Sequence, residues 1–153
     1  MEWQKGEFSL TNDREALDLS LIHGFLQTSY WAKGIPRETV ARAIANSLPF
    51  GLFHNGRQVG FCRVISDHAT FAYLADVFVV EGYRGQGLAK WLVSCVLAHP
   101  ELQGLRRWML ATLDAHGLYR QFGFTAPARP ERLMEITDPE IYIRKNLESG
   151  EPN

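Results

Sequence analysis

The segment 70–113 constrains the fold more than any other part of the sequence. It contains a strand-like apolar run, a glycine-rich turn, an amphipathic helical pattern and a second strand-like run. A strand, a helix and a strand in succession favour a parallel strand pair joined by a right-handed crossover. In chain order, these elements are expected at Thr70–Val80, at Tyr83–Gly87, from Leu88 to about His99, and at Arg106–Leu113.

The part of the chain before this segment predicts antiparallel strands. Two apolar runs, Phe50–Phe53 and Gln58–Ile65, are separated by His54, Asn55 and Gly56. Asn-Gly between apolar runs is a strong signal for a tight hairpin, because both residues tolerate a positive φ. An antiparallel meander therefore leads into the strand–helix–strand unit.

The two ends of the chain add further expected elements. Near the N-terminus we expect a short strand, Glu7–Thr11, a helix from Arg14, and a second helix from Pro36 with the apolar stripe Val40, Ile44 and Leu48. Toward the C-terminus we expect a short helix, Ala115–Phe122, one or two strands from Phe124, and a partly frayed tail after Asp138.

These elements predict one mixed α/β (α+β) domain that occupies residues 1–153, with its core at about residues 8–136. The expected sheet is mostly antiparallel, with a central β-α-β unit and helices on both faces.

Composition excludes several functional classes. A net charge of −1 and a pI of about 6.5 give no general attraction to nucleic acid or to anionic lipid. Cys62 and Cys95 lie far apart in apolar segments, and the histidines have no metal-ligand spacing, so we expect free thiols and no metal. No signal peptide or membrane-spanning run is evident, which favours a cytoplasmic protein without membrane partners.

The glycine-rich turn predicts an anion site. The first amides of a helix are unpaired and the helix dipole favours negative charge there, while Arg84 adds a planar donor. A dinucleotide fingerprint fails because its third small residue would be Lys90, and a triphosphate loop fails because Leu88 replaces its lysine. A purely structural role for Gly85 and Gly87, in a strand-to-helix turn, is the competing interpretation.

Two motifs resemble the GNAT superfamily of acyl-CoA-dependent N-acetyltransferases. Arg84-Gly85-Gln86-Gly87-Leu88-Ala89 matches the pattern [RQ]-x-x-G-x-[GA] of that family. The run 115–124, AHGLYRQFGF, is similar to its second signature, A-x-x-L-Y-x-x-x-G-F. The order of the expected elements also agrees with the family from about Phe8 to Ile136.

The resemblance implies that the anion is the pyrophosphate of coenzyme A, with acetyl-CoA as the acetyl donor. It also implies that the strand end before the turn splays from its neighbour and binds the pantetheine arm through its backbone. The residues implied in coenzyme binding are Phe78, Val79, Val80, Arg84, Gly85, Gln86, Gly87, Leu88 and Ala89.

The same resemblance suggests catalytic residues. A backbone N–H of Phe78 or Val79 would stabilise the oxyanion, and Tyr119 would donate a proton to the leaving thiolate. Asp76 is a carboxylate in an apolar strand, so it is a candidate base, although a water relay or a purely structural carboxylate explains it equally well.

The acceptor is expected to be a primary amine of a small molecule or peptide. Tyr30 and Trp31, between the first two helices, are candidate walls of its site, and His116 is a further candidate. The alternative to an enzyme is a non-catalytic acyl-CoA-binding or sensing module of the same fold. The sequence does not decide between a monomer and a homodimer.

Overall fold

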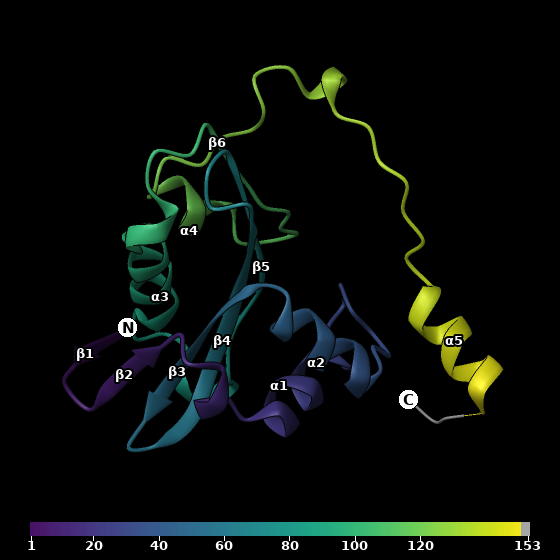
Figure 1. The fold of residues 1–153 in the computed structure, drawn as a ribbon, viewed down its shortest axis with the longest axis horizontal. Coiled ribbons are helices and arrows are strands. Elements are labelled where there is room, and N and C mark those ends of the chain that lie inside the picture. Colours follow the sequence, from purple (N-terminus) through teal and green to yellow (C-terminus); the bar gives the residue numbers. More distant parts are fainter. Residues whose placement is uncertain (151–153) are drawn as a thin grey trace. The chain divides into compact units, whose positions relative to one another are not determined.

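The computed structural model describes residues 1–150 and contains a six-stranded sheet whose strands follow one another in chain order (Figure 1). Neighbouring strands are antiparallel except for the last pair, β5 and β6, which are parallel. This mixed sheet with helices confirms the predicted fold class. The strands are β1 (Glu2–Lys5), β2 (Phe8–Thr11), β3 (Leu48–His54), β4 (Arg57–Ser66), β5 (Phe71–Val79) and β6 (Arg107–Met109).

The helices of the described chain include five α-helices and four short 3-10 turns, η1 to η4. The chain divides into two compact units, one of residues 1–17 and 44–124 and the other of residues 18–43 and 125 onward. The α-helices are α1 (Leu19–Leu26), α2 (Arg37–Ala45), α3 (Leu88–Leu97), α4 (His116–Arg120) and α5 (Ile141–Ser149).

The hairpin between β3 and β4 forms as the sequence predicts. Asn55 and Gly56 both have positive φ, 50° and 81°. These values are those of a two-residue turn that matches the right-handed twist of the flanking strands.

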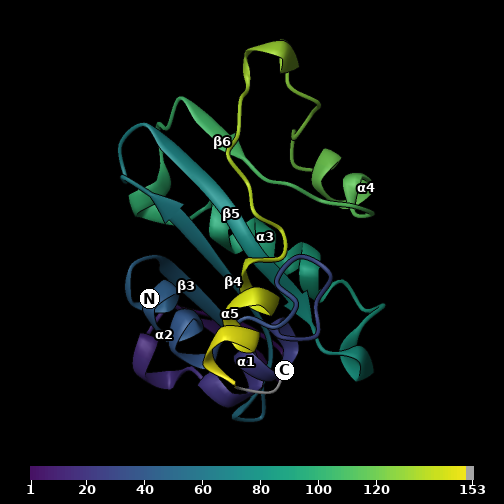
Figure 2. The ribbon, with the colours of Figure 1, turned by 90° about the vertical axis from the view of Figure 1, so that its right-hand side faces the viewer.

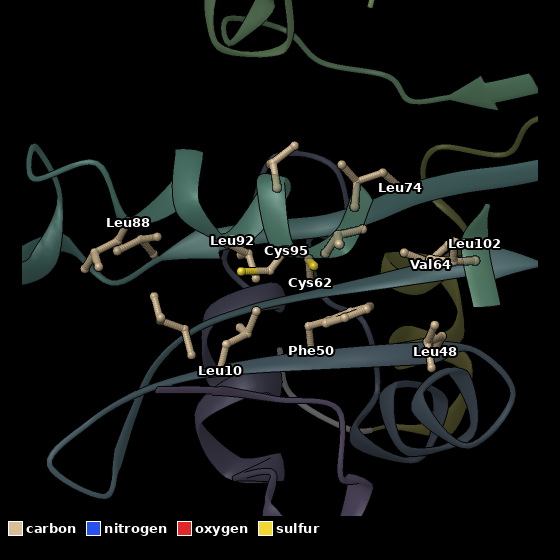
Figure 3. Close-up of a cluster of buried hydrophobic side chains, with 14 of the residues drawn as sticks. Leu10, Leu48, Phe50, Cys62, Val64, Leu74, Leu88, Leu92, Cys95 and Leu102 are labelled. Atoms are coloured by element: carbon tan, nitrogen blue, oxygen red, sulfur yellow. The ribbon is translucent and has the colours of Figure 1, made fainter. Parts of the chain in front are cut away.

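The core of the first unit lies between α3 and one face of the sheet (Figure 3). Leu88, Leu92 and Cys95 of α3 are buried, as the helical stripe predicts, and face strand residues such as Phe50 and Cys62. Burial of a large apolar side chain stabilises the fold by about 1.5–3 kcal/mol. The β5–α3–β6 crossover is therefore the expected parallel unit, anchored by its helix.

The second unit combines α1, part of α2 and α5. Asp18 caps α1 by accepting a hydrogen bond from the Leu21 N–H at 3.0 Å. The buried side-chain amide of Asn146, in α5, donates to the Gly34 carbonyl at 2.8 Å. Because both groups are removed from water, this bond ties α5 to the loop between α1 and α2.

Several predicted elements differ from those observed. Arg14–Ala16 is a 3-10 turn, and the helix starts only at Leu19, because Asp13 and Asp18 cap two separate turns. β1 was not predicted, and Leu48, expected on the second helix, begins β3.

The C-terminal expectations were wrong in two respects. No strand follows β6 within residues 110–150, where the chain instead forms η4 (Pro130–Arg132) and α5. Residues 125–140 are exposed throughout. The segment expected to fray contains α5, and residues 151–153 lie outside the described chain. None of the helices in residues 1–150 combines the length and apolarity needed to cross a membrane.

Candidate active site

The parallel strands β5 and β6 separate soon after they meet. Their pairing covers only Phe71–Tyr73 of β5 and Arg107–Met109 of β6, although β5 continues to Val79 (Figure 2). The stretch Leu74–Val79 therefore has no ladder partner on its β6 side among the described strands. This is a splayed strand end of the kind that the family resemblance implied.

Val79 presents its backbone toward the side that β6 has left. Its neighbour Val80 donates its N–H to the Val59 carbonyl of β4 at 2.9 Å, and Val79 pairs with Gly60 in the next position of the ladder. Backbone groups alternate between the two sides of a strand, so the N–H and C=O of Val79 point away from β4. By the same alternation, Phe78 takes part in the ladder with Phe61.

A β-bulge interrupts β5 at Asp76. The β4–β5 register shifts between Phe61 and Arg63, and Asp76 has a φ of 57°. One extra residue in β5 shifts the alternation of side chains, as a bulge does. Asp76 consequently lies on the face of Arg63, whereas Leu74, two residues earlier, belongs to the core under α3.

The carboxylate of Asp76 is paired with an arginine. Its Oδ2 accepts a hydrogen bond from Arg63 Nε at 2.6 Å, and the two side chains are only 11% and 19% exposed. Burial, and then the negative charge of Asp76, raise the pKa of the Cys62 thiol well above its usual range. Cys62 is therefore a protonated core residue, and Asp76 forms an ion pair with Arg63.

The glycine-rich turn leaves open space above its backbone. Gly85 and Gly87 have φ of 83° and 79°, and an added Cβ would meet no atom within 4 Å at either position. Gly87 is the N-cap residue of α3. Because glycine has no side chain, the first amides of α3 have no side-chain cap. Both positions favour glycine because their φ is positive, and the absence of a side chain also leaves room for a ligand.

The turn residues around the glycines have different environments. Arg84 is exposed, and its Nε donates to the Val79 carbonyl at 3.0 Å, a bond that does not use its terminal guanidinium nitrogens. Gln86 is exposed, Leu88 is buried in the core, and Ala89 is partly buried. Arg84 therefore links the open end of β5 to the turn.

Tyr119 lies in α4 and is buried at 8% exposure within the core of the first unit. Its ring contacts Phe124 edge-on, with centroids 5.9 Å apart. His116, the first residue of α4, is exposed. Ala115 is the N-cap residue of α4, which has no side-chain cap, and the Ala115 N–H donates to the Thr112 hydroxyl at 3.0 Å.

The aromatic pair expected at the acceptor site belongs to the second unit. Tyr30 and Trp31 are 60% and 42% exposed and contact each other edge-on at 5.0 Å. Both remain predictions for the acceptor site. No group of three or more potential metal ligands occurs in residues 1–150.

Arg63 was missed by sequence reasoning. A lone cation in the apolar run GFCRVIS resembles a residue at the exposed face of a strand. The available signal was a second charge, Asp76, in the next strand, since two opposite charges in adjacent apolar strands are expected to pair.

Comparison with known proteins agrees with this geometry. The model of the acetyltransferase (GNAT) family matches residues 15–124. A GNAT-family protein from Xanthomonas campestris pv. campestris is 55% identical; its crystal structure superposes with a TM-score of 0.87 over 88% of this chain and 96% of that one.

Two further proteins are similar to the chain. FG08082 of Gibberella zeae, described as a candidate acetyltransferase, is 30% identical over 140 residues, which is 76% of this chain and 78% of that protein. A Clostridium acetobutylicum protein crystallised with acetyl-CoA shares the fold, with 14% identity and a TM-score of 0.61 over 90% of this chain and 96% of that one. The splayed strand, the bulge and the open glycine turn thus occur in a chain that belongs to the GNAT family of acetyltransferases.

Proposed function

We propose that the protein transfers an acetyl group from acetyl-CoA to the primary amine of a small molecule or peptide. The observation that carries this proposal is the open end of β5, where Val79 turns its backbone toward the space left by β6, next to the open turn Arg84–Gly87. A backbone edge and an anion-binding turn in series match a ligand that has an amide-bearing arm and a pyrophosphate.

The residues present fit such a ligand. Backbone amides from Gly85 to Ala89 would hold the pyrophosphate, and the terminal nitrogens of Arg84 would add charge-assisted hydrogen bonds. The N–H of Val79 would bind either the pantetheine arm or the thioester carbonyl oxygen, where negative charge develops during attack. Phe78 and Val80 would contribute mainly shape, because their backbone positions belong to the ladder with β4.

The chemistry requires an amine nucleophile and a protonated leaving thiol. The amine nitrogen forms a bond to the acetyl carbon as the carbon–sulfur bond breaks, and the products are an amide and the free thiol of coenzyme A. In this proposal Tyr119 donates the proton to the sulfur. The amine loses its proton through a water relay or through Asp76, which would first have to weaken its bond to Arg63.

Coenzyme binding and acetyl transfer are tested separately. Calorimetric titration should show that the protein binds coenzyme A, and that Arg84→Ala weakens binding by about 1.5–3 kcal/mol through loss of a charge-assisted bond. Gly87→Val should weaken binding more, because its side chain would fill the space above the amides. Gly104→Val is the matched control for backbone strain, since Gly104 also has positive φ, 73°, and open surroundings but lies outside the turn.

Release of free thiol from acetyl-CoA in the presence of a panel of amines then measures transfer. The panel should contain polyamines, amino acids, aminoglycosides, arylalkylamines and peptides. Tight coenzyme binding without amine-dependent release would favour the acyl-CoA-sensing module. Equal affinity of the parent, Arg84→Ala and Gly87→Val would show that the turn is not the coenzyme site.

A further inference from the structure

A carboxylate, an imidazole and a phenol form a hydrogen-bonded row beside the glycine turn. Glu7 Oε2 lies 3.2 Å from His54 Nε2, and His54 Nδ1 lies 2.9 Å from the Tyr83 hydroxyl. Glu7 directly precedes β2, His54 ends β3, and Tyr83 is the last residue of η2 (Glu81–Tyr83). The row therefore connects the β1–β2 hairpin and β3 to the residue immediately before Arg84.

The proton positions in this row follow from its chemistry. An ionised carboxylate only accepts hydrogen bonds, so His54 Nε2 carries the proton and donates it to Glu7. Nδ1 of the neutral ring is then an acceptor, and the Tyr83 hydroxyl donates to it. The Asn55 amide nitrogen, 3.4 Å from Nε2, cannot also donate to a nitrogen that carries a proton, so the shorter contact to the carboxylate defines the tautomer.

Aromatic packing holds the same groups in place. Phe8 stacks on the His54 ring with centroids 4.7 Å apart and meets Tyr83 edge-on at 6.2 Å. The His54 and Tyr83 rings are 5.3 Å apart. Stacked and edge-on pairs of this kind are geometrically specific, so the three rings restrict the position of the Tyr83 side chain.

The backbone that follows Tyr83 is attached mainly at the two ends of the turn, since Arg84 Nε donates to the Val79 carbonyl and the Gly87 carbonyl accepts the Trp91 N–H at 3.0 Å. The Tyr83 N–H donates to the Val80 carbonyl at 2.9 Å, and the Arg84 N–H donates to Glu81 at 3.2 Å. Gly85, by contrast, has open surroundings, and glycine loses more conformational freedom on ordering than any other residue. A turn that is ordered before the ligand arrives avoids that cost on binding.

We propose that His54 is a positioning residue for the coenzyme, which acts by fixing Tyr83 and thereby the backbone of Arg84–Gly87. The inference rests on the proposed function, because it assumes that this turn binds the pyrophosphate. His54 itself touches no part of the ligand in this proposal. Its effect is confined to the nucleotide end of the donor and does not extend to the acetyl group.

The test uses two variants that preserve ring packing. Tyr83→Phe removes only the hydroxyl, and His54→Phe keeps a ring against Phe8 while removing both nitrogens. Each should raise the dissociation constant of coenzyme A, measured by calorimetry, about threefold to tenfold, as expected for one hydrogen bond. The double variant should be no weaker than the worse single variant, because both changes remove the same bond.

A truncated donor separates positioning from general damage. In steady-state assays with acetyl-CoA, each variant should raise KM by the same factor and change kcat less than twofold. With S-acetylpantetheine, which lacks the pyrophosphate, the ratio of variant to parent kcat/KM should stay near one. Tyr73→Phe in β5 is the matched control for loss of a tyrosine hydroxyl and should leave the affinity for coenzyme A unchanged.

The outcomes separate this inference from the proposed function. If the parent binds coenzyme A and both variants bind it equally well, the positioning role of His54 is refuted while the proposed function stands. Equal losses with acetyl-CoA and S-acetylpantetheine would also refute it, because they would indicate general damage. If the parent does not bind coenzyme A, both the inference and the proposed function are wrong.

Discussion

Replacement of Asp76 by asparagine tests whether this carboxylate stabilises the bulge or acts as a base. Asparagine has nearly the same size and tolerates positive φ as aspartate does, so the substitution removes the charge without straining the backbone at φ 57°. An alanine at this position would add strain and confuse the two effects.

The structure sets the size of the expected change. A hydrogen bond between charged groups contributes about 1.5–3 kcal/mol, and removal of one member of a buried ion pair costs about 3–5 kcal/mol. The Arg63 and Asp76 side chains keep 19% and 11% exposure, so a value where the two ranges meet applies, about 3 kcal/mol. In a domain of this size, that loss lowers Tm by roughly 6–12 °C.

Urea unfolding of four proteins provides the measurement: the parent, Asp76→Asn, Arg63→Met, and the double variant. The double variant should be less destabilised than the sum of the single variants, because it leaves no unpaired charge in the interior. Asp138→Asn is the matched control, since it breaks an Asp–Arg pair that is exposed, and it should leave the free energy of unfolding unchanged.

Activity of the same four proteins then separates the two roles. A base at Asp76 predicts that Asp76→Asn lowers kcat/KM and removes the rising limb of its pH profile, and that Arg63→Met does not restore it. A structural carboxylate predicts that activity follows stability and recovers in the double variant. If Asp76→Asn unfolds within about 0.5 kcal/mol of the parent, the assignment of the ion pair as stabilising is wrong.

Two further predictions concern Tyr119 and His99. Tyr119→Phe should fold and bind acetyl-CoA nearly as the parent does but turn over about 10² to 10⁴ times more slowly, measured as amine-dependent thiol release; an unchanged rate would remove its role as proton donor. Burial lowers the pKa of His99, against an opposing effect of Glu101, so the folded protein resists protonation of this ring. The unfolded chain takes up that proton below about pH 6.5, so stability from the neutral ring is present above that pH and declines as the pH falls toward the lowered folded value. Unfolding free energies at pH 7.5 and 5.5 should therefore differ more in the parent than in His99→Gln; an equal difference would contradict the assignment.

Elements whose signals are local could be predicted from the sequence. The Asn55-Gly56 turn depends on two residues that tolerate positive φ, and the apolar stripe of α3 depends only on helical spacing. The glycine turn was predictable for the same reason, because the requirement for positive φ at Gly85 and Gly87 is a property of those residues.

Elements that depend on a distant partner could not be predicted. The run Leu133–Ile136 has an apolar content typical of a strand, but a strand requires hydrogen bonds to a neighbour, and these residues form none within the described sheet. The side of β5 on which Asp76 lies depends on a bulge, whose presence is visible only in the register with β4.

Because of the bulge at Asp76, the number of residues in β5 matters for its pairing with β4 as well as their types. The pairing register with β4 differs by one residue between the part of β5 before the bulge and the part that ends at Val79. If β5 kept its length but paired with β4 without the bulge, Val79 would move one position along the ladder, its N–H would turn toward β4, and the carbonyl that anchors Arg84 would face the wrong side. Conservative apolar substitutions within β5 should therefore be far better tolerated than insertion of one residue between Leu74 and Val79.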